Sequence, residues 1–230
     1  MISIVLPTFN EAENLPGFFS SLVRSKYDDY EVLVVDGRSK DDTVGIAERF
    51  GARIIMEKKP GVGVARNTGL KTAKGELVAS LDADSLLCDS WLDRVVWNFT
   101  KHPNLQALSG PSYYGSMLYD TWSTTTQWQN NFSPITGFAY LGANNSVYNT
   151  GYFRSVGGWS ETLDEEMELS LRLFHKRAKV RYDWDLKVKL SDRRFRERGF
   201  FRTVFGWSVD ALEAVIGHRR DRSGYSDWRR

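Results

Sequence analysis

The sequence predicts an α/β protein built on a doubly wound, mostly parallel sheet. Short apolar runs alternate with segments that carry apolar residues at helical spacing. Four such runs and three intervening helical segments follow one another within roughly the first eighty residues, the order typical of βαβ units. The length of 230 residues is enough for one sizeable domain with an appendage.

The elements of this first part can be placed in order from their apolar runs and helix-start signals. The expected strands cover residues 2–6, 31–35, 53–56, 76–81 and 105–109. Four helices are expected. The first begins after Asn10, the second begins after Asp41 as its N-cap, and the other two cover residues 63–72 and 91–99. In such sheets ligands bind at the carboxyl ends of the strands, so this half is expected to bind a nucleotide or a similar molecule.

The pattern changes after the fifth strand. Residues 111–150 are rich in Ser, Thr, Asn, Gln, Tyr and Trp, which favours polar and aromatic surfaces and loops over further alternation. Aromatic faces beside hydroxyl and amide groups suit a sugar ring, although a wet packing layer has the same composition. We therefore expect a domain over 1–190, with a nucleotide-binding half (1–110) and an acceptor half (111–190), and a basic amphipathic tail over 191–230.

Composition and charge exclude several classes of protein. The net charge of +2 is too small to indicate nucleic acid as a partner. The single cysteine, Cys88, excludes an intramolecular disulfide framework, and the N-terminal residues lack the pattern of a secretory signal. No run reaches the ~18 to 20 apolar residues of a membrane span. We expect a cytoplasmic protein, soluble or peripheral at the cytoplasmic membrane face.

Two aspartates in LVASLDADSLL follow the buried run that ends at Leu81. If the strand continues through Asp82 and Asp84, both carboxylates point the same way, because alternate residues of a strand share a face. Paired hard oxygen ligands suit Mg²⁺ or Mn²⁺ together with a phosphate group. A solvated turn at the strand end is the structural alternative.

A glycine pair precedes the third helix in GVGVAR. A dinucleotide-binding fingerprint requires a third glycine where this chain has Arg66, so a dehydrogenase is excluded. Gly61 and Gly63 instead precede a helix whose first turn presents backbone N–H groups, and Arg66 on it is placed to reach a base or a phosphate. A surface arginine at a helix start is the alternative interpretation.

Six motifs occur in a fixed order along the chain: LPTFNE, VVDGRSKDDT, GVGVARNTG, LDAD, GGW and EEMELSLRL. In this order and spacing the chain resembles the family 2 glycosyltransferases, enzymes of the GT-A fold that use nucleotide sugars. The resemblance covers roughly residues 1–175, and several collinear motifs are more specific than any one of them.

The resemblance implies roles for residues of the first half. It places Pro7, Thr8 and Glu11 in the nucleoside pocket and Asp36 on the base. It also implies that Arg66 holds the nucleotide, Asp82 lies near ribose and metal, and Asp84 ligates the metal directly. The family often has Asp-Asp-Gly-Ser where this chain has Asp36, Gly37, Arg38 and Ser39, so the second aspartate is missing and the base is not fixed; UDP is favoured over GDP.

The resemblance also assigns the acceptor side. Glu166, with Glu165 second, is expected to act as general base in a single-displacement, inverting transfer, although carboxylates at a helix start also serve as capping charges. Asn144 matches a family region that touches donor sugar and acceptor. Trp159 either stacks on the acceptor or belongs to the core.

The tail carries an apolar stripe flanked by arginines, formed by Phe201, Val204, Phe205, Ser208, Leu212, Val215 and Ile216. A basic amphipathic helix of this kind can lie on an anionic membrane, and relatives with a similar Arg-Arg-Phe segment use lipid-linked acceptors. Arg193 and Arg194 can instead clamp a diphosphate. Packing of the helix on the domain or on a second subunit is the structural alternative.

These observations together predict a metal-dependent, inverting hexosyltransferase. It would move a hexose from a nucleotide diphosphate sugar to a lipid-linked or glycan acceptor, with Mn²⁺ or Mg²⁺ as cofactor. A sugar-nucleotide nucleotidyltransferase would need a glycine-rich, lysine-containing signature near the first strand, which LPTFNE lacks. A non-catalytic nucleotide-binding adaptor would predict the loss of Asp82, Asp84 or Glu166, and all three are present.

Overall fold

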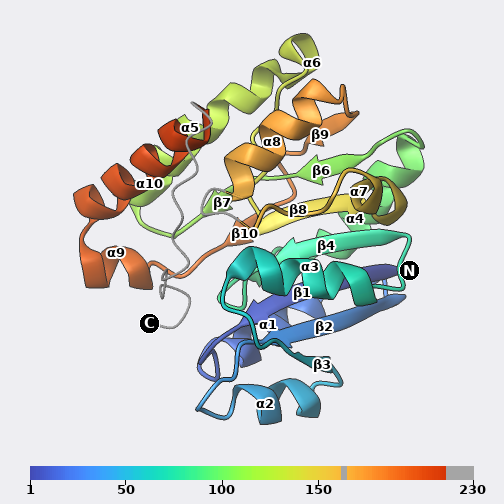
Figure 1. Cartoon of the computed structure of the whole chain (residues 1–230), viewed down its shortest axis with the longest axis vertical. Helices are drawn as coiled ribbons and strands as arrows, with labels where there is room; N and C mark the ends of the chain where they lie inside the picture. Colours follow the sequence, from blue (N-terminus) through green and yellow to red (C-terminus); the bar gives the residue numbers. More distant parts are fainter. Residues whose placement is uncertain (162–164, 216–230) are drawn as a thin grey trace.

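A central seven-stranded sheet organises the fold. The computed structural model describes residues 1–161 and 165–215. The sheet contains β1 (Ile2–Thr8), β2 (Tyr30–Asp36), β3 (Arg53–Met56), β4 (Leu77–Leu81), β6 (Ala107–Ser109), β8 (Asn145–Asn149) and β9 (Val180–Tyr182). Its order is β3-β2-β1-β4-β8-β6-β9, and β8 runs antiparallel to both of its neighbours (Figure 1). The remaining strand pairs are parallel, which confirms the predicted mostly parallel sheet.

A second, small sheet lies beyond the carboxyl end of β4. It consists of β5 (Leu86–Leu87), β10 (Val188–Lys189) and β7 (Ser112–Tyr113), with β10 in the middle. Its strands come from three distant parts of the chain. The small sheet therefore ties the segment after Asp84 to the segment that precedes the C-terminal helices.

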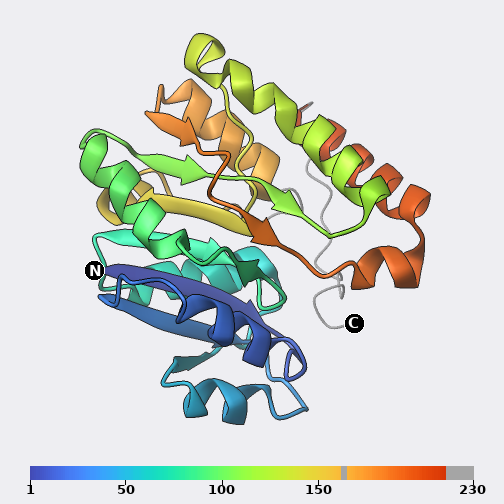
Figure 2. The ribbon, with the colours of Figure 1, turned by 180° about the vertical axis from the view of Figure 1, so that it is seen from behind.

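Helices cover both faces of the central sheet (Figures 1 and 2). They are α1 (Leu15–Leu22), α2 (Thr43–Arg49), α3 (Val62–Thr72), α4 (Trp91–Lys101), α5 (Met117–Gln127), α6 (Ser133–Thr136), α7 (Thr150–Ser155), α8 (Glu165–His175), α9 (Arg193–Arg198) and α10 (Phe200–Val215), with a 3-10 helix, η1 (Trp128–Phe132). Apolar residues of α1 and α4 share one buried cluster with the sheet, and those of α3, α7 and α8 share the other.

The alternation of side chains along β1 separates these two layers. Ile4 and Leu6 belong to the cluster under α1 and α4, whereas Val5 belongs to the cluster under α3. At Gly69 of α3, an added Cβ would lie 2.4 Å from Cγ1 of Val5. A side chain at this position would push the helix away from β1, so Gly69 allows α3 to pack closely on the sheet.

The expected elements of the first half match the structure within one or two residues, except that α1 begins at Leu15 rather than directly after Asn10. Three further corrections apply. β1 continues through Pro7 to Thr8, because an internal proline is tolerated when its missing N–H is not needed by the ladder. The N-cap position of α2 is Asp42, while Asp41 accepts a hydrogen bond from the Thr43 N–H at 3.1 Å. β5 between Asp84 and α4 was not predicted.

Residues 111–150 contain more regular structure than predicted. They include α5 and the strand β8, which lies between β4 and β6 and so joins the two expected halves in one sheet. The pattern of β8, NSVYN, has polar residues at both ends and in between, and four of its five residues are nevertheless buried. Its apolar signal is too weak to be recognised from sequence alone.

The C-terminal helices pack on the domain through a group of aromatic rings, which we call the aromatic cluster: Tyr114, Tyr119, Trp122, Phe195 and Phe200. The ring centroids of Tyr119 lie 4.3 Å from those of Phe195 and 5.6 Å from those of Phe200, in stacked geometry. Phe195 is 2 % exposed. This packing supports the structural alternative for one face of the tail.

The other face of α10 remains exposed over its first turns. Phe201 is 85 % exposed and Phe205 is 72 % exposed, one helical turn apart. The side chains of Leu212 and Val215, and Ile216 as a whole, lie outside the described residues. Among the described helices, none has the length and hydropathy that crossing a membrane requires.

Candidate active site

The carboxyl ends of β1 and β2 form one side of the candidate site. Thr8 and Asp36 are paired in register at these ends, and the Thr8 hydroxyl donates to Asp36 Oδ2 at 2.9 Å. Ser39 donates to the same carboxylate from its backbone N–H at 2.8 Å and from its hydroxyl at 2.6 Å. Asp36 is fully buried and fixes the loop that follows β2. Its expected contact with a base stays a prediction.

The two aspartates of LDAD lie on a turn at the end of β4. The strand ends at Leu81, and the backbone N–H of Ser85 donates to the carbonyl of Asp82 at 3.1 Å. The predicted strand end at Leu81 therefore agrees with the structure, and the turn between Asp82 and Ser85 matches the structural alternative of a turn at the strand end. Asp82 and Asp84 are each partly exposed, and Ala83 between them is buried.

Arg66 links α3 to this turn. Its guanidinium Nη2 lies 2.6 Å from Asp82 Oδ1, and its side chain is 4 % exposed compared with 38 % for Asp82. Because it is buried and paired, the guanidinium has a fixed position at the site rather than the solvated one of an ordinary helix-start arginine. α3 begins after Gly61, whose φ of +126° lies in the region that favours glycine.

The start of α9 returns to the carboxyl ends of the strands. Arg193 Nη2 lies 3.1 Å from Glu11 Oε1, a contact between residues 182 positions apart. Burial lowers the pKa of Arg193, and the carboxylates of Glu11 and Asp84 raise it more, so the net pKa lies above its ordinary value. Arg193 therefore shares one electrostatic environment with Glu11 and Asp84. The side chain of Arg194 lies outside the described residues.

Asp82 and Asp84 fit a divalent cation of the Mg²⁺ or Mn²⁺ type. Both offer carboxylate oxygens, and Oδ1 of Asp82 is paired with Arg66. Within residues 1–161 and 165–215, no group of three or more His, Cys, Asp or Glu side chains could surround one ion. A cation held here would therefore complete its shell with water and substrate phosphate oxygens, which is the usual arrangement for Mg²⁺.

Glu166 lies in the first turn of α8 with both carboxylate oxygens held. Oε1 accepts a hydrogen bond from the backbone N–H of Ala143 at 2.8 Å, and Oε2 accepts one from the Tyr140 hydroxyl. Tyr140 was not predicted, since no motif marks it. The side chain of Glu165 lies outside the described residues.

The buried Tyr148 hydroxyl connects the two sides electrostatically. Burial is the largest influence on the pKa of Tyr148 and raises it, and the Glu166 carboxylate also raises it. The Ser146 hydroxyl and the charges of Arg66 and Arg172 lower this pKa by less, so the net shift is upward. Glu166 and Arg66 thus act on the same buried hydroxyl. The candidate base and the arginine that pairs with Asp82 lie in one part of the fold.

Asn144 and Trp159 differ in their accessibility. Asn144 is partly exposed, and its Oδ1 accepts a hydrogen bond from the Ser112 hydroxyl at 2.9 Å. Trp159 is 2 % exposed, and its ring packs against Phe153 and Tyr148. These contacts favour the core interpretation of Trp159 and leave its ring no open face for a sugar.

Asn67 holds the backbone of Trp159 at two points. Its Nδ2 donates to the Trp159 carbonyl at 2.8 Å, and its Oδ1 accepts from the Trp159 N–H at 2.9 Å. An added Cβ on Gly158 would lie 2.5 Å from Asn67 Oδ1, so the glycine of GGW permits this contact. Asn67 follows Arg66, and α3 therefore contacts both the aspartate turn and the segment that leads to α8.

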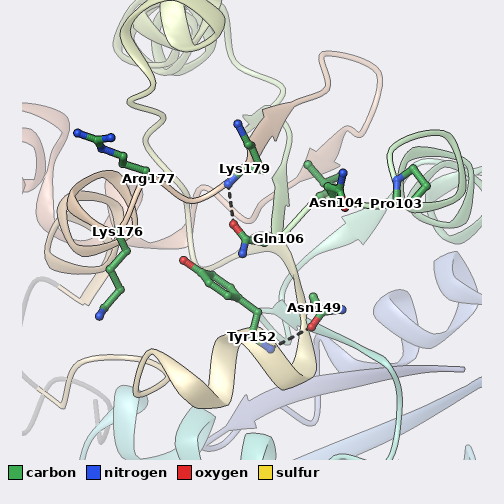
Figure 3. Close-up of a pocket in the computed structure, with 9 residues that line it drawn as sticks. Pro103, Asn104, Gln106, Asn149, Tyr152, Lys176, Arg177 and Lys179 are labelled. Atoms are coloured by element: carbon green, nitrogen blue, oxygen red, sulfur yellow. Dashed lines mark hydrogen bonds between the residues drawn. The ribbon is translucent and has the colours of Figure 1, made fainter.

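A shallow hollow of about 450 Å³ lies away from these residues, between the start of β6, the end of β8 and the loop after α8 (Figure 3). Gln106, Asn149, Tyr152 and Lys179 line it, together with Lys176 and Arg177. Figure 3 shows a hydrogen bond between Gln106 and the Lys179 backbone, and another between Asn149 and the Tyr152 backbone. None of the predicted site residues lines this hollow, so it is a separate surface feature.

Comparison with known proteins shows the family and the fold of this chain. The sequence model described as "Glycosyl transferase family 2" matches residues 3–205. An uncharacterized glycosyltransferase of Mycobacterium tuberculosis is 36 % identical over 104 residues, which cover 45 % of this chain and 46 % of that protein. The poly(ribitol-phosphate) beta-N-acetylglucosaminyltransferase TarP of Staphylococcus aureus is 32 % identical over 117 residues, 47 % of this chain and 36 % of that protein. The chain thus aligns with less than half the length of these relatives.

Solved structures share the fold at low identity. The mannosyltransferase PcManGT from Pyrobaculum calidifontis, in complex with GDP-Man and Mn²⁺, superposes with a TM-score of 0.68 at 19 % identity, over 83 % of this chain and 56 % of that chain. TarS of S. aureus, in complex with UDP-GlcNAc, gives 0.64 at 20 % identity, over 83 % of this chain and 58 % of that chain. At this identity the likeness shows the fold, which is GT-A.

Proposed function

Because the chain belongs to glycosyl transferase family 2, we propose that it is a metal-dependent, inverting hexosyltransferase. The observation that carries the proposal is the grouping at the carboxyl ends of the strands. Asp82 with Arg66 after β4, and Glu11 with Arg193 after β1, form a polar site of mixed charge beside Asp84. Such a site suits a nucleoside diphosphate together with a cation.

The donor proposed is a UDP-sugar, with a GDP-sugar as the alternative. In this role Arg66 keeps Asp82 in place, Asp84 ligates Mn²⁺ or Mg²⁺, and Arg193 lies beside the same carboxylates, where it can bind a diphosphate oxygen. Pro7, Thr8, Glu11 and Asp36 form the nucleoside side. A bound divalent cation supplies stabilisation of the negative charge that develops on the leaving diphosphate.

Glu166 is the proposed general base. A carboxylate within hydrogen-bond reach of an acceptor hydroxyl removes its proton as the oxygen attacks the anomeric carbon. Attack from the face opposite the leaving diphosphate inverts the configuration at that carbon in one displacement. Support comes from the fixed orientation of Glu166, whose two carboxylate oxygens both accept hydrogen bonds.

The proposed acceptor is a lipid-linked sugar or a glycan, reached at the cytoplasmic face of a membrane. The surface that supports this consists of the exposed Phe201 and Phe205 on α10 and the exposed Arg196 and Arg202 beside them. Apolar side chains flanked by cations bind anionic interfaces through both insertion and charge. Asn144 is assigned by resemblance to the donor sugar, in a region that also touches the acceptor, and Arg194 to the acceptor side.

A nucleotide-binding experiment tests the donor assignment. Thermal unfolding should be followed with UDP, GDP, UDP-GlcNAc and GDP-Man, each with Mn²⁺ and with EDTA, since a ligand of the native state raises the melting temperature. We expect UDP and UDP-GlcNAc to raise the melting temperature in Mn²⁺ and to leave it unchanged in EDTA. A rise with GDP compounds only would change the donor base, and no rise with any nucleotide would contradict the proposal.

A further inference from the structure

Residues 140–143, just before β8, contact the first half of α8 at three points. Two of them are the hydrogen bonds to the Glu166 carboxylate from Tyr140 and Ala143. The Leu141 N–H donates to the Ser170 hydroxyl at 3.0 Å, and that hydroxyl donates to the Glu166 carbonyl at 2.7 Å. The segment therefore holds the side chain of Glu166 and the helix that carries it.

The backbone of Tyr140 is fixed from its other side by Asn130 of η1. Asn130 Oδ1 accepts from the Tyr140 N–H at 2.8 Å, and its Nδ2 donates to the Tyr140 carbonyl at 3.2 Å. Asn130 is 2 % exposed, so these hydrogen bonds are shielded from water. The Tyr140 hydroxyl thus approaches Glu166 from a rigid support.

We propose that Tyr140 is a positioning residue for the base of the transfer, acting through its hydroxyl on Glu166. The inference rests on the proposed role of Glu166. A carboxylate held on one oxygen can rotate about the bond to its methylene group, whereas one held on both oxygens has a single orientation. A general base needs its oxygen within hydrogen-bond reach of the proton that it removes, and a small misplacement costs much of the rate.

The test compares Tyr140→Phe with Tyr152→Phe. Phenylalanine keeps the ring of Tyr140 and removes the hydrogen bond to Glu166. Tyr152, on α7, is the matched control, because its hydroxyl is buried and has no hydrogen-bond partner among the described residues. A hydrogen bond to a charged group is lost in Tyr140→Phe alone, so its kcat should fall about 10- to 100-fold. The KM for the donor should change less than about twofold.

A double-mutant cycle with Glu166→Gln separates positioning from a general structural effect. If Tyr140 acts through Glu166, Tyr140→Phe should lower the residual rate of Glu166→Gln by less than about twofold. Equal losses in both backgrounds, or a wild-type kcat for Tyr140→Phe beside an inactive Glu166→Gln, would overturn the inference and leave the proposed function standing. Full activity of Glu166→Gln would overturn both.

Discussion

The nucleotide-binding half and the acceptor half reach their geometry by different routes. In residues 1–110 the site residues sit at strand ends or helix starts, so the sheet topology brings Thr8, Asp36 and Asp82 to one edge. In the acceptor half the decisive contacts are hydrogen bonds of single side chains that no strand pairing dictates. Tyr140 and Glu166 are separated by 26 positions, and Asn67 and Trp159 by 92. Topology fixes the first site, whereas individual side chains fix the second.

The largest effect should follow removal of one charge in the nucleotide half. Asp84→Asn keeps the size of the side chain and removes the anionic ligand, so turnover should fall at least about a thousandfold and metal-dependent nucleotide binding should be lost. Titration calorimetry of UDP with Mn²⁺, alongside turnover, measures both. Asp89→Asn is the control, since Asp89 is an exposed partner of Arg24. Wild-type turnover in EDTA would refute the metal assignment.

In the acceptor half, Glu166→Gln should separate chemistry from binding. Turnover should drop by about a hundredfold or more, the range expected for loss of a general base, while donor affinity changes little. Glu165→Gln is the neighbouring control and should have a milder effect. An inactive Glu165→Gln beside an active Glu166→Gln would move the base by one position.

The stability that the contact between Asp183 and α4 gives to the two halves should depend on pH. Asp183, which is 5 % exposed, accepts hydrogen bonds at 2.7 Å from Arg94 and Asn98 of α4. Burial raises the pKa of Asp183, and these two donors lower it more, so its net pKa lies below the ordinary value. The stabilisation is therefore complete above about pH 4, the unfolded pKa, and is lost as pH falls through the lower folded value.

Urea unfolding at pH 7 and pH 3 checks this sign. Asp183→Asn should lower the free energy of unfolding at pH 7 by about 2 to 3 kcal/mol, because it leaves the Arg94 charge without its buried partner. The same substitution should also reduce the difference between the free energies of unfolding at pH 7 and pH 3. Asp185→Asn removes a 65 % exposed partner of the same arginine and should cost less than about 1 kcal/mol. Equal losses for the two variants would contradict a buried link.

The smallest effect concerns the exposed face of α10. Phe201→Ser with Phe205→Ser should weaken co-sedimentation with anionic vesicles about tenfold or more, since a buried aromatic side chain contributes about 2 kcal/mol. Ile135→Ser, at an 85 % exposed position on α6, is the control. Binding should also weaken with salt, which screens the arginines. Unchanged sedimentation of the double variant would exclude this face as the anchor.

The sequence predicts those elements that local signals determine and misses those that depend on partners far away in the chain. The strand over 53–56 and the helix ending at residue 72 agree with the structure because apolar periodicity is a local signal. β8 was not predicted, because it is buried through its pairing with β4 and β6, and these strands lie far away in sequence. The turn at Asp82 was expected only as an alternative, because a hydrogen bond between Ser85 and Asp82 leaves no compositional mark.

The site residues divide in the same way. The family resemblance assigned Arg66, Asp82 and Glu11 to one nucleotide site, and the structure pairs Arg66 with Asp82. The pairing of Glu11 with Arg193, 182 positions apart, was not predicted. Tyr140 and Asn67 could not be found in advance, since each acts through one hydrogen-bonding geometry that depends on the final packing. The GGW glycine was the available hint for Asn67, because a glycine with φ of +68° signals a close approach.

The pair between Glu11 and Arg193 also bears on the order of events during synthesis. Proteins emerge from the ribosome N-terminus first, and early elements such as β1 to β4 can pair while the later chain is still missing. The acidic groups around Glu11 and Asp84 receive the charge of Arg193 only after residue 193 has been made. A nascent chain that has paired β1 to β4 would thus still lack the Arg193 partner of Glu11, and this link between the first strand and the C-terminal helices would form late in synthesis.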